Sequence, residues 1–190
     1  MPSPSPVTSG SRRPRGFTLI EMLTAVAVLA VTTTVGIPAL NGFVTGNRAA
    51  AQVNSLIGAL NYARSEAVSS ARQVSLCPYT EDADATDAAA RYSCMNSTTW
   101  QQGWVVFRAV VDEAGNPTGA REILRVFGPL SSGDALSGNV STITYLPTGF
   151  LADDAASPRF SLIPQSCSAD QRREVSLSLQ GQAHVATANC

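Results

Sequence analysis

The chain has 190 residues and carries thirteen arginines, no lysine, fourteen carboxylates and one histidine, for a formal charge of −1 at pH 7. A balance so close to neutral excludes a protein that attracts nucleic acid through its overall charge, although it allows a local basic patch. The length allows one globular domain with its own core beside a terminal apolar segment.

A basic segment followed by a long apolar one lies near the N-terminus. Three arginines between residues 12 and 15 precede Gly16, and Glu21 is the one charged residue among residues 17–40. This stretch is long enough to cross a bilayer, which takes about 20 apolar residues, and the arginines predict a cytoplasmic N-terminus. Because a carboxylate in lipid costs roughly 2.5–3.5 kcal/mol, we expect Glu21 to serve a function with a partner.

Residues 15–23, with Gly16, Phe17 and Glu21 in place, resemble the prepilin signal of type IV pilins and type II secretion pseudopilins. The resemblance implies that a prepilin peptidase cleaves between Gly16 and Phe17 and that the new N-terminal Phe17 is methylated. It also implies that Glu21 pairs with the N-terminal amine of a neighbouring subunit. Residues 1–16 would then be a leader, residues 17–46 a transmembrane assembly helix and residues 47–190 a periplasmic domain.

Two other interpretations of the N-terminus are weaker. An ordinary secretory signal has an apolar region of about 7–15 residues, with a small-residue cleavage site after it. Here the apolar region is longer and cleavage would fall before it. A plain membrane anchor would explain the length of the segment but would not require Glu21. The prepilin interpretation is therefore favoured.

Helical periodicity continues beyond the apolar segment. Proline removes a helix hydrogen bond and clashes with the preceding turn, so a kink or local melting is expected near Pro38. The helix is expected to resume over residues 47–72, where apolar side chains near i, i+3, i+4 and i+7 spacing form one stripe: Val53, Leu56, Ile57, Leu60, Ala67, Val68 and Ala71. We expect this stripe to pack on a sheet.

The rest of the chain has the pattern of an antiparallel β domain, which makes the predicted fold class α+β. A turn at residues 112–119 predicts that residues 103–127 form a hairpin. Residues 79–99 are expected to be a polar, acidic loop, and residues 128–139 a second loop. Strands are expected at residues 74–77, 103–111, 122–127, 142–146, 159–163, 174–179 and 182–187.

Four cysteines, Cys77, Cys94, Cys167 and Cys190, lie beyond the apolar segment, on the side expected outside the cytoplasm. An even number there indicates disulfides. Three pairings exist, and the simplest joins sequence neighbours, Cys77 with Cys94 and Cys167 with Cys190. Free buried thiols are the alternative. The spacings match no zinc pattern, so no metal or other cofactor is expected.

Four segments of the domain refine the resemblance. They are similar to landmarks of the subgroup that contains the minor pilins FimT and FimU and the minor pseudopilin GspH, which implies a pilin-like fold with a long N-terminal helix on antiparallel sheets. The same segments have a plain structural interpretation, with Trp100, Trp104 and Phe107 in the core and Gly103 and Gly149 in turns or bulges. The segments are residues 64–67, 100–107, 122–125 and 146–149.

No segment predicts an active site. His184 is the lone histidine, and no orienting acid or nucleophile can be assigned to it from the sequence. The sequence contains no G-x-S-x-G motif and no phosphate-binding loop. Residues 81–87 are acidic but lack the glycine and the terminal glutamate of a calcium loop. An enzyme is therefore not expected.

DNA binding is an alternative that the C-terminal sequence weakens. Some FimT proteins are DNA-uptake pilins, and the resemblance places a Gly-Arg-x-Arg motif where this chain has residues 181–184, Gly-Gln-Ala-His. Arg172 and Arg173 could join Arg159 in a small patch that contacts phosphates. Without residues 1–16, however, ten arginines face fourteen carboxylates, a formal charge of −4. A solvated surface is the favoured interpretation.

The sequence thus predicts a minor type IV pilin that initiates or caps a pilus used in motility, adhesion or DNA uptake. A DNA-binding minor pilin for natural transformation and a minor pseudopilin of a type II secretion system are the alternatives. Expected partners are other major and minor pilins, the prepilin peptidase, the membrane and the inner-membrane assembly platform. The chain would cross the bacterial inner membrane once, with its domain in the periplasm, and later join an extracellular pilus.

Overall fold

The computed structural model describes residues 16–131, 133–152 and 157–190, so most of the predicted leader lies outside the described residues. The chain divides into two compact units, residues 1–41 and residues 42–190. Helix α1, Leu19–Ser70, contributes its first part to one unit and its last part to the other.

Helix α1 is continuous between its ends. The backbone nitrogen of Glu21 donates to the hydroxyl of Thr18 at 3.3 Å, which satisfies one of the free amides of the first turn. Helical structure continues through residues 35–39, so of the two outcomes expected near Pro38, local melting is not observed. The helix ends two residues earlier than expected, where Ala71 adopts a φ of 53°.

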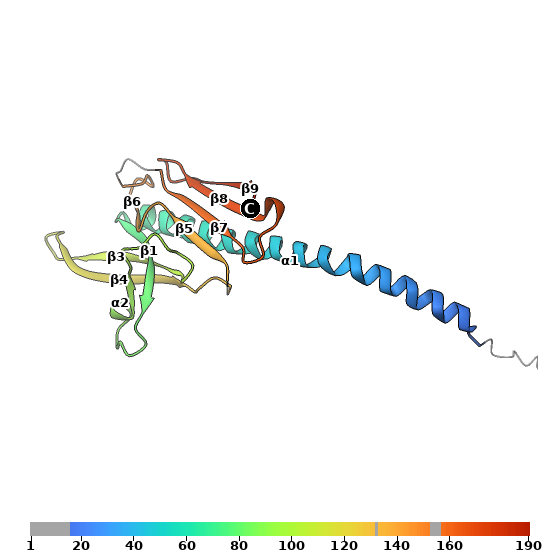
Figure 1. The fold of residues 1–190 in the computed structure, drawn as a ribbon. Coiled ribbons are helices and arrows are strands. Elements are labelled where there is room, and N and C mark those ends of the chain that lie inside the picture. Colours follow the sequence, from blue (N-terminus) through green and yellow to red (C-terminus); the bar gives the residue numbers. More distant parts are fainter. Residues whose placement is uncertain (1–15, 132, 153–156) are drawn as a thin grey trace, which may run out of the picture. The chain divides into compact units, whose positions relative to one another are not determined.

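Two antiparallel sheets follow within residues 42–190 (Figure 1). The first has the order β2-β1-β3-β4, with β6 also paired to β1, and the second has the order β5-β7-β8-β9. The strands of the first sheet are β1 Val74–Glu81, β2 Tyr92–Cys94, β3 Trp104–Val111, β4 Pro117–Phe127 and β6 Ile143–Tyr145. Those of the second are β5 Ala135–Gly138, β7 Arg159–Ile163, β8 Arg172–Leu177 and β9 Ala183–Ala188.

The last part of α1 forms the core together with the inner faces of both sheets. Its small and branched side chains permit close packing. Of the stripe predicted from the sequence, Val53, Leu56, Leu60 and Ala67 are buried and Ile57 is partly buried, whereas Val68 and Ala71 at its end are exposed. Trp100 lies in this core with its ring edge-to-face with Phe160, at 5.0 Å between centroids, and Trp104 stacks on Phe127 at 6.0 Å. The buried side chains of this part of α1 are Ala49, Val53, Leu56, Ala59, Leu60, Ala63 and Ala67.

The expectation of a loop at residues 79–99 is wrong in part, because only residues 82–87 and 95–99 lie outside helices and strands. Strand β1 continues to Glu81, and β2 pairs with its last three residues. Helix α2, Ala88–Arg91, lies between the two strands, and the carboxylate of Asp87 caps it by accepting from the backbone nitrogen of Ala90 at 2.8 Å. The two strands are separated in the sequence by a polar segment, and they pair beside the Cys77–Cys94 disulfide. Because that segment is polar, the sequence predicted a loop and the pairing was missed.

The expectation of a loop at residues 128–139 is wrong in part, because β5 occupies its end. Only Leu136 of this strand is buried, so the segment lacks the repeated alternation that indicates a strand. Strand β7 matches its expected range, and β4 begins five residues before the expected start at residue 122. The expected hairpin at residues 103–127 is present as the β3–β4 pair.

Gly103 is required by its backbone. Its φ of 104° disfavours other residues, and a Cβ atom there would collide with the carbonyl oxygen of Phe127. The short 3₁₀ helix η1, Ala169–Gln171, precedes β8, and the side chain of Gln171 donates to the carbonyl oxygen of Gly42 at 3.0 Å. This bond fastens the second sheet to the last part of α1.

Candidate assembly helix and its attachment to the domain

The predicted cleavage site lies immediately before α1. Gly16 and Phe17 lie ahead of the helix, outside regular secondary structure, and the Phe17 side chain is 78% exposed. Glu21 is exposed in the first turn and forms no ion pair with any described residue. The helix N-terminus carries partial positive charge, so a carboxylate is favourable there. The segment can therefore offer both an accessible peptide bond and a free carboxylate.

The first part of α1 exposes apolar side chains on all sides. Its threonine hydroxyls donate to carbonyl oxygens one turn back, as Thr24 does to Glu21 at 2.9 Å and Thr32 to Val28 at 3.0 Å. The polar groups of these threonines are thus satisfied within the helix, which leaves an apolar surface suited to packing against other helices. The exposed side chains are Phe17, Leu19, Ile20, Met22, Leu23, Val26, Val28, Leu29 and Val31.

Residues 17–46 are the predicted transmembrane segment. Among the described residues, neither α1 nor any other helix combines the length and the apolar character that crossing a membrane takes.

A buried carboxylate attaches α1 to the loop before β5. Asp134 accepts from Arg48 Nη2 and from Gln52 Nε2, each at 2.8 Å, and from the backbone nitrogen of Gln165 at 2.9 Å. Its side chain is fully buried, so these donors replace the water that the carboxylate loses on folding. This cluster was not predicted from the sequence. The one signal for it is that Arg48 and Gln52 lie at i, i+4 beside the apolar stripe.

The four landmark segments of the sequence meet in space. Arg64 Nε donates to the carbonyl oxygen of Gly149 at 2.9 Å, which joins the first landmark to the last. Arg108, directly after the second landmark, bridges Glu66 at 3.5 Å and Glu122 at 2.8 Å. These residues thus connect α1, β3, β4 and the turn after β6. In this chain these residues have a structural role, because their contacts hold the last part of α1 against the sheet.

Both disulfides that the pairing of sequence neighbours predicts are present. Cys77 and Cys94 join β1 to β2, and Cys167 and Cys190 join the segment before η1 to the end of the chain. The backbone nitrogen of Cys190 also donates to the carbonyl oxygen of Ala169 at 2.9 Å. The C-terminus is therefore fixed beside η1.

The three arginines of the possible DNA patch do not share one face. Arg172 and Arg159 lie on the outer face of the second sheet, where Arg172 forms an ion pair with Glu174 at 2.9 Å and donates to Ser161 Oγ at 3.0 Å. Arg173 points to the opposite face and donates to the carbonyl oxygen of Asp170 at 2.6 Å. Glu174 therefore offsets much of the charge that Arg172 would present to phosphate.

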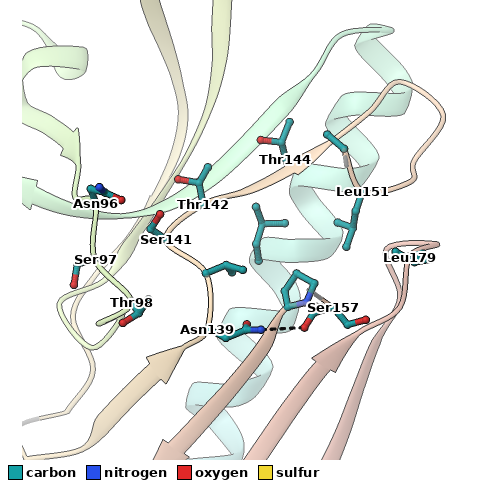
Figure 2. Close-up of a pocket in the computed structure, with 14 residues that line it drawn as sticks. Asn96, Ser97, Thr98, Asn139, Ser141, Thr142, Thr144, Leu151, Ser157 and Leu179 are labelled. Atoms are coloured by element: carbon teal, nitrogen blue, oxygen red, sulfur yellow. Dashed lines mark hydrogen bonds between the residues drawn. The ribbon is translucent and has the colours of Figure 1, made fainter. Parts of the chain in front are cut away.

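A groove of about 800 Å³ lies where the two sheets separate (Figure 2). Thr142 and Thr144 line it from β6 and the turn before it, and Asn96 and Thr98 line it from the segment before β3. Asn139 donates to the carbonyl oxygen of Ser157 across one end, at 3.3 Å. No carboxylate, imidazole or guanidinium belongs to the described lining, which therefore offers hydroxyl and amide groups for hydrogen bonding but no acid–base pair.

Comparison with known protein families decides the family. The family described as type II transport protein GspH matches residues 52–181, more than half of the chain, and the prokaryotic N-terminal methylation motif matches residues 11–37. The chain belongs to the GspH family. Both matches agree with the resemblance predicted from the sequence, and the methylation motif covers Gly16, Phe17 and Glu21. No curated protein matches the chain significantly.

Solved structures of a minor pilin and a minor pseudopilin are similar in part. The type IV minor pilin FimU of Pseudomonas aeruginosa PAO1, in its P21 crystal form, is 21% identical with a TM-score of 0.48, over 73% of this chain and 85% of that one. The minor pseudopilin EpsH of the Vibrio cholerae type 2 secretion system is 12% identical with a TM-score of 0.45, over 74% of this chain and 97% of that one.

The GspH family consists of structural subunits, so membership agrees with the expectation that this chain is not an enzyme. The lone histidine, His184, lies exposed on β9. Its strand partner is Ser176 of β8. The α+β fold with a long N-terminal helix and antiparallel sheets is confirmed.

Proposed function

We propose that this chain is a minor type IV pilin, cleaved between Gly16 and Phe17 and methylated on Phe17, that initiates or caps a pilus. The observation that carries the proposal is the first part of α1, which exposes apolar side chains on every side and has Glu21 as its one charged residue. In water such a surface would leave its apolar side chains exposed, which is unfavourable. We therefore expect lipid to cover it first and the helices of other subunits to cover it after assembly.

Glu21 would act at the moment of assembly. Cleavage creates a free amine on Phe17, and in a bundle of parallel helices this amine of one subunit can lie beside the Glu21 carboxylate of the next. Each group is costly to place alone in an apolar setting, and the pair lowers that cost for both. Helix packing would therefore be favourable only in the register that brings the two charges together.

Replacement of Glu21 tests this role. We expect Glu21→Ala and Glu21→Gln to leave cleavage and membrane association intact, while incorporation into sheared filaments falls strongly. Glu113→Ala removes an exposed carboxylate in the β3–β4 turn and is the matched control. Immunoblots of membrane and filament fractions give the measurement. Normal incorporation of both Glu21 variants would overturn the assembly role.

Replacement of Gly16 tests the processing step separately. A bulky residue there, as in Gly16→Leu, should block the peptidase and leave residues 1–16 attached. Mass spectrometry of the membrane-extracted protein would then show the full chain, whereas the unaltered protein should begin at a methylated Phe17. A mature mass in Gly16→Leu would place the cleavage elsewhere.

A pseudopilin of a type II secretion system is the second candidate, because the matching family is described as a type II transport protein. The inner membrane and periplasm would be its location in either case, with the assembly platform as partner. Deletion of the gene separates the two. Loss of pili with normal secretion supports the pilin, and loss of secretion with normal pili supports the pseudopilin.

DNA binding is not favoured, because Arg172 is paired with Glu174 and Arg173 faces away from Arg159. We expect no band shift with duplex DNA at low salt, and no change on replacing Arg159, Arg172 and Arg173 with alanine. A shift that weakens with salt and with these substitutions would revive the DNA-uptake role.

A further inference from the structure

Strand β9 forms an open edge of the second sheet. It pairs with β8 along its whole length, from Ala183 opposite Leu177 to Ala188 opposite Arg172. Apart from this pairing, no backbone hydrogen bond within the described part of the chain involves residues 183–188. The outward-facing amide and carbonyl groups of this edge are therefore free to pair with another extended backbone.

The other sheet edges are each protected. The far edge of β5 is bridged by the segment before β3, where the backbone nitrogen of Trp100 donates to Leu136 at 2.8 Å. The far edge of β6 is covered in the same way by Leu151 and Ala152. Strand β2 has only three residues, and β4 carries charged side chains and two register irregularities. Short length, charge, bulges and covering segments are the devices that prevent edge pairing.

None of these devices occurs in β9. Its sequence, Ala-His-Val-Ala-Thr-Ala, has no lysine, arginine, carboxylate, proline or glycine, and its register with β8 is regular. Val185 lies opposite the buried Val175 but is itself 46% exposed, so a strand added outside β9 would cover it. Alanines at three of the six positions allow close approach from either face.

Both ends of β9 are fixed. Before it, Gly181 adopts a φ of 74° and donates its backbone nitrogen to the carbonyl oxygen of Ser178 at 2.8 Å, which closes the turn from β8. After it, Cys190 is tied to Cys167. A strand held straight at both ends loses little further freedom on pairing, which favours binding.

A second copy of this chain does not fit the edge. Antiparallel pairing of two β9 strands would use a two-fold axis that also reverses the direction of the last part of α1, which lies along the inner face of the sheets from Ala49 to Ala67, over about 27 Å. Subunits whose helices bundle in parallel cannot adopt that arrangement. Parallel pairing of two β9 strands about a two-fold axis along the strands would turn the inner face of one sheet outward, so the two α1 helices would lie on opposite faces of the joined sheet and could not bundle. Head-to-tail pairing would need a second open edge, and every other edge of the described residues is protected.

We propose that β9 is a strand-addition interface for one different pilin-like subunit, which places an uncharged edge strand of its own beside residues 183–188. This inference rests on the proposed function, because it needs a neighbour whose helix runs parallel to α1. It adds a partner contact in the globular domain to the helix contact at Glu21. A chain with a single open edge can take one such neighbour, which suits an end of a filament better than its repeating body.

Photo-crosslinking in cells that assemble the filament tests the proposal. Benzoyl-phenylalanine in place of Thr187 on β9 should form an adduct with one other pilin-like protein, and mass spectrometry should locate the linked residue on an edge strand of that protein. The same probe in place of Ala120, exposed on the protected edge strand β4, should form no such adduct. Adducts with a second copy of the chain, or no adduct at Thr187 in assembled filaments, would overturn the inference.

A charge placed on the edge gives a second test. Val185→Lys should lower the yield of the Thr187 adduct about tenfold, the effect of about 1.4 kcal/mol, because a lysine on an edge opposes pairing. Ala186→Glu is a second variant on the outer face, and Ala120→Lys is the matched control. Thermal unfolding of each purified protein checks that the fold is retained. An unchanged yield in both folded β9 variants contradicts the inference.

The result also separates this inference from the proposed function. If the chain enters filaments in a Glu21-dependent way but Thr187 gives no adduct, only the β9 interface fails. If the chain never enters filaments, the proposed function fails, and the same probe in the membrane fraction still decides the edge. An adduct there with a pilin-like protein supports the interface, and its absence refutes it.

Discussion

Arg64 on α1 donates its Nε–H to the carbonyl oxygen of Gly149, at 2.9 Å, in the turn after β6. Gly149 adopts a φ of 80°, and a Cβ atom there would lie 3.2 Å from Val68 and 3.3 Å from Arg64 itself. The two residues come from landmarks 85 positions apart in the sequence. The contact gives both residues a structural role: Arg64 supplies the donor, and Gly149 leaves room for the arginine side chain.

Loss of this bond should weaken the attachment of α1. We expect Arg64→Ala to lower the free energy of unfolding by about 1–2 kcal/mol, because a charged donor is removed from a half-buried carbonyl. Urea unfolding of the purified protein gives the measurement. Arg72→Ala is the control, since Arg72 donates to Ala109 at an exposed position and should contribute less than about 0.5 kcal/mol. Equal effects of the two changes would contradict the assignment.

The Asp134 cluster should contribute more. Asp134→Ala leaves Arg48, Gln52 and the backbone nitrogen of Gln165 without their shared acceptor, so we expect a loss of about 2–4 kcal/mol. Asp84→Ala, at an exposed position, should change little. The double variant with Arg48→Ala should lose less than the sum of the single changes, because the two residues share one interaction. Additive losses would show that the ion pair between Asp134 and Arg48 does not account for the loss of stability.

The helix and most strands follow from local pattern, whereas pairing at a distance does not. The buried part of the stripe, from Val53 to Ala67, could be predicted because helical spacing repeats along one segment. The β1–β2 pairing is concealed because Tyr79 and Tyr92, whose rings meet edge-to-face at 5.2 Å, lie on either side of an acidic segment. Asp134 is concealed because its donors come from α1 and from the loop after β7.

The basic patch shows the same limit in the functional prediction. Neighbouring residues of a strand point to opposite faces, so Arg172 and Arg173 could have been separated from the sequence alone if the strand had been expected to begin at residue 172. The expected start at residue 174 placed both arginines in a loop. Residues two apart in a strand share a face, so the ion pair between Arg172 and Glu174 could have been predicted in the same way.

The disulfides should protect different parts of the domain. Replacing Cys77 and Cys94 with serine removes a link across 17 residues, worth about 3 kcal/mol in the chain-entropy account. Hydrogen exchange should then increase first in residues 78–94. Replacing Cys167 and Cys190 should instead release β9 and leave residues 78–94 protected. The same exchange pattern in both variants would contradict this division.

Tyr145 should make stability fall at high pH. Its ring is buried, and burial raises the pKa of the phenol above its ordinary value, while the nearby charge of Arg64 acts weakly in the opposite direction. In the unfolded chain the phenol loses its proton near pH 10, whereas in the folded chain it stays protonated to higher pH. The unfolded state therefore binds fewer protons above pH 10, and the free energy of unfolding decreases as pH rises through this range.

Tyr145→Phe removes the titrating group and keeps the ring. The hydroxyl contact with the carbonyl oxygen of Gly181 is long, at 3.5 Å, so its loss should be small at pH 7. We expect the unfolding temperature of the unaltered protein to fall more steeply between pH 9 and pH 11 than that of Tyr145→Phe, measured by circular dichroism at matched ionic strength. Tyr62→Phe is the control, because Tyr62 lies at the edge of the core and packs beside Arg125. Parallel curves for the unaltered protein and Tyr145→Phe would show that Tyr145 does not control the alkaline limit.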